Sequence, residues 1–242
     1  APLVIAFDAL SYVISFFLLK SVKTDAAPAT EQSRKSAWAV IREGAEFVAK
    51  EPTLRALTLS SIFATAGASM FAAVQLLFFL RTLSFEPANI GLIMSVAGIA
   101  SVAGALLCGF LTKRLGPGWA IIISTGLPGL GYLATAATPA NGLALPLVLA
   151  FQAIVGLCGP IYAINEVTLR QTLSSDALLP TISSFRSFIA GSAGPVGAIL
   201  GGVLAERLGL RAVLEIASIT FMAAMIPLFY LARRSQEAVE VS

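Results

Sequence analysis

The chain has 242 residues, of which 57% are hydrophobic and only 12% are charged, and its mean hydropathy is +0.87. This composition excludes an ordinary soluble domain. Histidine is absent, which excludes a Ser-His-Asp triad and removes the commonest metal ligand.

Seven apolar stretches account for the high hydropathy. Each is close to the ~20 residues that a helix needs to cross ~30 Å of hydrocarbon, and five of them contain no Asp, Glu, Lys or Arg. The sequence therefore predicts an all-α integral membrane protein with seven transmembrane helices. They are expected at residues 2–19, 56–80, 88–112, 119–137, 143–165, 189–205 and 212–232.

A polar segment separates the first stretch, which belongs to residues 1–20, from the others. Its Ala, Pro, Thr, Ser and charged residues predict a linker at 21–53. Within it, residues 36–50 predict an amphipathic helix that lies on the membrane surface, either as a simple anchor or with a further role. Short connections join the last six stretches, so residues 54–234 are expected to form one bundle, followed by a tail at 235–242.

The basic residues fall unevenly on the two sides of these crossings. With seven crossings, 13 of the 16 Lys and Arg residues share one side with the linker and the C-terminus. Because basic loops stay in the cytosol, the sequence predicts a multi-pass protein of the cell membrane, inner or plasma. Its linker 21–53 and its C-terminus are expected in the cytosol, and its lipid partner is the bilayer.

Small residues at four-residue spacing predict close helix contacts in two stretches. The stripes are Ala97, Ser101, Ala105 and Gly109, and Ala190, Gly194, Ala198 and Gly202, with Gly197, Gly201 and Ala205 beside the second.

Glycine and proline also interrupt the stretches. Since proline removes a backbone hydrogen bond, these positions act either as conformational hinges or as static kinks that improve packing. The candidate hinges are Gly159, Pro160, Gly194, Pro195, Gly201 and Gly202.

Four segments carry a resemblance to a known family. They are FDALSYVISFFLL at 7–19, REGAEFVAKEPTLRAL at 42–57, GFLTKRLGPG at 109–118, and LRQTLSSDALLPTISSFRSFIAGSAGPVGAILGGVLAERLGLR at 169–211. With the order of span, linker and six further spans, they resemble the major facilitator superfamily from its sixth helix to its C-terminus. Within it, they resemble bacterial exporters of the macrolide-efflux and siderophore-export kind.

The resemblance implies about twelve helices in two six-helix halves that alternate access to a midplane site. Residues 1–20 would be the last helix of the N-terminal half, and residues 54–234 the C-terminal half. The missing N-terminal half is then a partner, and the expected function is proton-coupled efflux of drug-like or siderophore-like molecules. An uptake permease and a non-transporting fragment or scaffold remain alternatives. No enzyme activity, cofactor, metal or nucleic-acid partner is expected.

A loop motif of this family is matched in part by Gly109, Leu111, Arg114 and Gly116. Lys113 stands where the family has an acid, and residues 117–118 replace a basic pair. A charge-relay gate at this loop is therefore in question.

Substrate candidates follow from the helices that line the central cavity in the family. Amide and aromatic side chains would suit a bulky amphipathic compound better than an ion. The alternative is that they pack or hydrogen-bond between helices. The candidates are Phe71, Gln75, Phe78, Gln152, Tyr162 and Asn165.

Ionisable residues inside spans are costly, so each is a candidate for gating or coupling. Asp8 lies near the outer end of the first stretch, where the cost is reduced. Glu166 precedes Arg170 by one turn, as in a simple interfacial ion pair. The sharper hypothesis is that Glu166 and Arg186 form a cytosolic gate.

Overall fold

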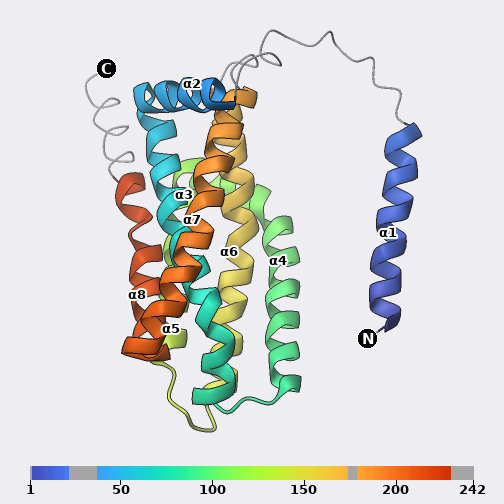
Figure 1. Ribbon diagram of the computed structural model, residues 1–242, viewed down its shortest axis with the longest axis vertical. Coiled ribbons are helices and arrows are strands. Elements are labelled where there is room, and N and C mark those ends of the chain that lie inside the picture. Colours follow the sequence, from blue (N-terminus) through green and yellow to red (C-terminus); the bar gives the residue numbers. More distant parts are fainter. Residues whose placement is uncertain (1, 22–36, 174–178, 230–242) are drawn as a thin grey trace. The chain divides into compact units, whose positions relative to one another are not determined.

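The computed structural model describes residues 2–21, 37–173 and 179–229, and every regular element in these residues is a helix (Figure 1). The expected linker residues 22–36, the loop at 174–178 and the tail from 230 onward lie outside the described residues. The helices are α1 (Pro2–Ser21), α2 (Ala37–Lys50), α3 (Pro52–Leu77), a π-helical turn η2 (Phe78–Thr82), α4 (Pro87–Leu115), α5 (Pro117–Ala137), α6 (Ala144–Leu173), α7 (Leu179–Leu208) and α8 (Leu210–Met222).

The fold class expected from the sequence is confirmed. Six helices are long and apolar enough to cross a membrane, and the candidate spans are Pro52–Thr82, Pro87–Leu115, Pro117–Ala137, Ala144–Thr172, Leu179–Leu208 and Leu210–Phe229. The first expected span is present as helix α1. Its residues Leu10–Lys20 form a shorter apolar helix, and α1 belongs to a separate unit of the chain from the six-helix bundle.

Most spans are longer than their apolar stretches. Three of the six spans begin at a proline: Pro52, Pro87 and Pro117. At a helix start the N–H that proline lacks is not needed, and the φ angle of proline already suits a helix. Helix α7 begins at Leu179, ten residues before the expected start, because polar residues continue the helix beyond the apolar window. Prolines 128, 160 and 195 lie within α5, α6 and α7, which are assigned as helix throughout.

The bundle is built from two groups of three helices. Helix α3 packs against α7 and α8, and helix α6 packs against α4 and α5, while α5 and α8 join the two groups. Helices α3 and α6 barely touch each other. The space between α3 and α6 is therefore available for a site.

Glycines place helix backbones in direct contact. A Cβ atom on Gly197 of α7 would collide with the Ala66 carbonyl of α3, and one on Gly156 of α6 would collide with the Ala97 carbonyl of α4. By contrast, Gly109 and Gly202 of the expected stripes face open space. Ala97 and Gly194 of these stripes do lie against a neighbouring helix, but a strict four-residue spacing drifts around a helix with 3.6 residues per turn, so the C-terminal end of each stripe leaves the contact.

From Val40 onward, helix α2 packs on α7 at one end of the bundle, here called the α2 end (Figure 1). Val48 joins a small apolar cluster with Ile182 and Phe185, and Gly44 allows Phe185 to approach closely. On this face Val48 is buried and Ile41 and Ala45 are partly buried, whereas Trp38 is exposed. Helix α2 is thus fastened to α7.

The glycine contact predicts a difference between two substitutions in the same helix. Gly197→Ala should lower the free energy of unfolding by about 1–3 kcal/mol, because the new methyl group meets a backbone carbonyl that cannot move away alone. Gly202→Ala is the matched control, which should be neutral or raise stability by up to about 1 kcal/mol. Thermal unfolding in detergent measures both. Equal effects of the two variants would contradict close packing at Gly197.

Candidate functional site

A cavity of about 320 Å³ lies between α3 and α6, with α5 and α8 forming its remaining walls. None of its lining residues is charged, and most of its surface is apolar. The lining residues are Ala64, Thr65, Ala68, Ser69, Ser124, Thr125, Pro128, Tyr132, Val155, Gly159, Tyr162 and Phe221.

Several hydroxyl groups of this cavity are already hydrogen-bonded within their own helix. Ser124 Oγ donates to the Ala120 carbonyl at 2.6 Å, and Thr125 Oγ1 donates to the Ile121 carbonyl at 2.8 Å. Such back-bonding satisfies the hydroxyl without a partner from another helix. The cavity is therefore suited to a mainly apolar compound with a few polar groups.

The structure places the six substrate candidates in different environments. Tyr162 lines the cavity. Phe71 and Phe78 belong to the main hydrophobic core, where Phe71 stacks on Tyr132 with ring centroids 4.3 Å apart. Phe71 thus meets the cavity wall through Tyr132. Gln152 is buried, and Gln75 is partly buried with an amide nitrogen that has no hydrogen-bond partner.

Asn165 joins helices α4 and α6. Its Oδ1 accepts a hydrogen bond from Thr112 Oγ1 at 2.9 Å, and its Nδ2 donates to the Ile161 carbonyl at 2.8 Å and to Cys108 Sγ at 3.4 Å. Asn165 faces α4 and serves as an interhelical clamp in this structure.

Half of the cavity residues that sequence reasoning missed lie on α5 and α8, and the others lie on α3 and α6. Ser124, Tyr132 and Phe221 were not considered because the family resemblance pointed to the other four helices. The clustering of Ser124, Thr125 and Pro128 on one face of an otherwise apolar helix was the available signal.

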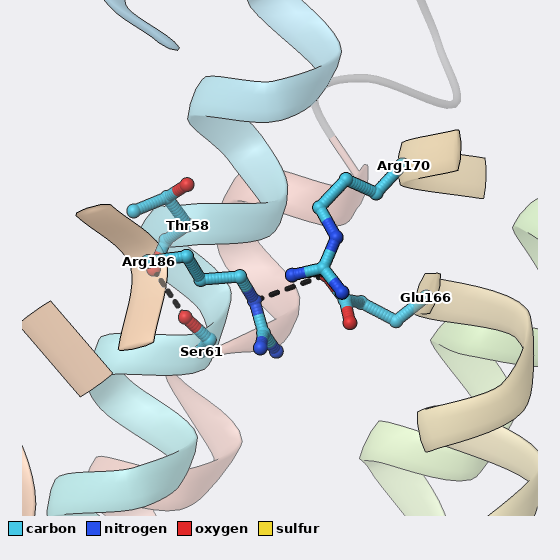
Figure 2. A network of polar contacts seen from close by, with 5 residues as sticks. All are labelled: Thr58, Ser61, Glu166, Arg170 and Arg186. Carbon is cyan, nitrogen blue, oxygen red and sulfur yellow. Dashed lines mark hydrogen bonds and ion pairs between the residues drawn. The ribbon is translucent and has the colours of Figure 1, made fainter. Parts of the chain in front are cut away.

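Near the α2 end, one carboxylate lies between two guanidinium groups (Figure 2). Glu166 Oε1 lies 3.0 Å from Arg186 Nε and 3.9 Å from Arg170 Nη1. Only 2% of the Glu166 side chain is exposed, against 12% for Arg170 and 21% for Arg186. The structure therefore brings together three of the four candidates for gating or ion coupling, Glu166, Arg170 and Arg186, and the acid among them is buried.

This charged cluster adjoins the cavity. Tyr162 precedes Glu166 by about one helical turn, and its phenol lies close enough to Arg186, Glu166 and Ser60 to interact with them electrostatically. Removing one partner of a buried ion pair costs about 3–5 kcal/mol, because the other charge is left uncompensated. The cluster can therefore hold α6 and α7 together at this end.

The family model of the Major Facilitator Superfamily matches residues 57–242. The chain belongs to this superfamily.

The superfamily membership makes the chain a multi-pass membrane protein of a transporter family, and points to transport rather than to catalysis. A curated relative is the multidrug efflux pump Tap of Mycolicibacterium fortuitum, which is 27% identical over 226 residues. The match covers 91% of this chain and 52% of the relative. The chain thus spans about half the length of that pump.

The superfamily loop motif lies at the end of α4. Lys113 and Arg114 are exposed, and the Arg114 guanidinium lies 4.7 Å from the Phe110 ring centroid. Gly116 has φ of +78°, a conformation that favours glycine, and it links α4 to α5. Gly109 faces open space.

The remaining gating, hinge and metal-site predictions concern different parts of the chain. Asp8 lies in α1, but its side chain is outside the described part of the chain. Among the expected hinges, Gly159 lines the cavity, and Gly194 and Gly201 approach α3. In the described ranges 2–21, 37–173 and 179–229, no group of three metal-binding side chains occurs.

Proposed function

We propose that the chain forms part of a secondary transporter that exports drug-like or siderophore-like small molecules by alternating access. The cavity between α3 and α6 supports this proposal, because its size and mainly apolar walls suit such compounds. The match to a multidrug efflux pump supports export rather than uptake.

In this proposal the chain works with an N-terminal half of the same transporter, and α1 is the last helix of that half. The α2 end and the C-terminus face the cytosol, in line with the distribution of basic residues. Export is driven by proton entry. In exporters of the kind that the chain resembles, the carboxylate that couples protons usually belongs to the N-terminal half.

The partner half can be tested at the level of the gene. We expect the coding DNA directly upstream of Ala1 to continue in frame and to encode five more apolar spans, since the superfamily builds its site between two halves. DNA sequencing gives the answer. A stop codon or an unrelated domain at this position would contradict the proposed partner.

The cavity can be tested by filling it. Gly159 lines the cavity and has open space around its Cβ position, so Gly159→Leu should occupy the cavity without a backbone clash. Because one extra methylene in a tight apolar pocket costs roughly 10–200-fold, we expect export to fall by about tenfold or more. Export of a neutral fluorescent compound, the amide of 1-pyrenebutyrate, from cells that express the complete coding sequence measures this.

Gly142→Leu is the matched control, because Gly142 also has open space but lies in the connection between α5 and α6. The control should export normally. Equal export by Gly159→Leu and the unmodified protein would exclude this cavity as the substrate site. Net accumulation of this neutral probe above that of cells without the protein would indicate uptake instead.

We also propose that Glu166 and Arg186 form a gate at the cytosolic end, which opens and closes during the cycle. Glu166→Gln should lower the export rate about tenfold or more, because the closed gate would leave the Arg186 guanidinium without its carboxylate, at a cost of about 3–5 kcal/mol. Quantitative immunoblotting of membranes should show an unchanged protein level.

Glu206→Gln serves as the control, since Glu206 is exposed near the other end of α7. The exchange variant Glu166→Arg with Arg186→Glu should restore part of the export. Normal export by Glu166→Gln at an unchanged protein level would overturn the gate.

A further inference from the structure

The charged cluster beside the cavity carries more positive than negative charge. The ion pairs of Arg170 and Arg186 both go to the same carboxylate, Glu166. Among residues 37–173 and 179–229, the ion pairs set two guanidinium groups against one carboxylate at a largely buried position. Burying a charge is costly unless an anion or further hydrogen bonds compensate it.

Two buried hydroxyl groups beside this cluster also lack good hydrogen bonds. Ser60 is fully buried, and neither its Oγ nor the hydroxyl of Tyr162 makes a hydrogen bond of good geometry. Tyr162 lies close to both Ser60 and Arg186. The neighbouring Ser61 differs, since its Oγ donates to the Thr58 carbonyl at 2.8 Å. Buried hydroxyls without partners favour a ligand that accepts hydrogen bonds.

The terminal nitrogens of Arg186 are directed toward the cavity. Its Nε lies against Glu166, while its terminal nitrogens point away from Arg170, in the direction in which α3 runs from Thr58 to Ser61 (Figure 2). The next turn of α3 holds Ala64 and Thr65, which line the cavity. A ligand in the cavity can therefore present an anionic group to this guanidinium past Tyr162.

We propose that Arg186, with the hydroxyls of Tyr162 and Ser60, forms a subsite for a carboxylate of the transported molecule. This inference rests on the proposed function and narrows its substrate class. The cavity holds the apolar body of the molecule, and Arg186 pairs with its acidic group. Arginine is suited to this role because its planar fork matches a carboxylate. A cationic compound finds no charged partner among the cavity-lining residues.

The test compares three probes that share one aromatic body: 1-pyrenebutyrate, its neutral amide and 1-pyrenebutylamine. Binding to the transporter expressed from the complete coding sequence is measured by fluorescence anisotropy in phosphatidylcholine nanodiscs, which carry no net lipid charge. We expect the butyrate to bind roughly tenfold more tightly than the amide, as for a hydrogen-bonded charged group. The amine should bind more weakly than the amide.

Variants identify the residues responsible. Arg186→Gln should remove the preference for butyrate over amide while the amide still binds, which shows that the cavity is intact. Tyr162→Phe keeps the aromatic ring and should reduce the preference by a smaller factor. Arg114→Gln, at an exposed position at the end of α4, is the matched control and should leave the preference unchanged.

The outcomes separate this inference from the proposed function. Equal binding of butyrate and amide, or a preference that survives Arg186→Gln, would overturn the carboxylate subsite and leave the cavity supported. Failure of all three probes to bind would overturn both. If added phosphatidylglycerol abolishes the preference for butyrate, the anionic occupant is a lipid headgroup and the assignment to substrate is wrong.

Discussion

Direct contact between helix backbones determines the spacing of the bundle. Gly197 lets α7 approach the backbone of α3, and Gly104 and Gly156 let α4 and α6 approach each other. Lipid tails are as apolar as the side chains, so helices in a bilayer associate through such close packing rather than through the hydrophobic effect. Because each of α3 and α6 is drawn toward a different partner, the two separate from each other, and the cavity lies between them.

The same arrangement explains why the charges gather where they do. Arg186 lies about two turns into α7 and Glu166 about two turns before the end of α6, so both are near the α2 end. At that depth a lone charge is costly, and a close ion pair reduces the cost. The cluster has two guanidinium groups for one acid, and none of the cavity-lining residues is charged.

The sequence was sufficient to predict the fold class, because an apolar stretch of about 20 residues or more is enough to indicate a transmembrane helix. It was less informative about helix ends, since polar residues continue α6 and α7 well beyond the apolar windows. The pairing of Glu166 with Arg170 follows from helical spacing, whereas its pairing with Arg186 depends on how α6 meets α7.

Cavity residues were harder to predict than the ion pair. Spacing along a helix shows which residues share a face, but it does not show which helix that face meets. Phe71 and Asn165 illustrate this limit, because Phe71 faces the core and Asn165 faces α4. Tyr132 could have been considered only with knowledge that α5 forms part of the cavity wall, whereas Ser124 shares a face of α5 with two other residues that interrupt its apolar character.

The back-bonded hydroxyls of α5 have a consequence for the variety of compounds that the cavity can accommodate. Ser124 and Thr125 donate to carbonyl oxygens of their own helix, and both line the cavity. Rotation about one side-chain bond redirects such a hydroxyl, with no movement of the backbone. An apolar guest leaves these donors satisfied by the helix, while a guest with an exposed acceptor recruits them. The wall thus adapts its polarity to the molecule it meets.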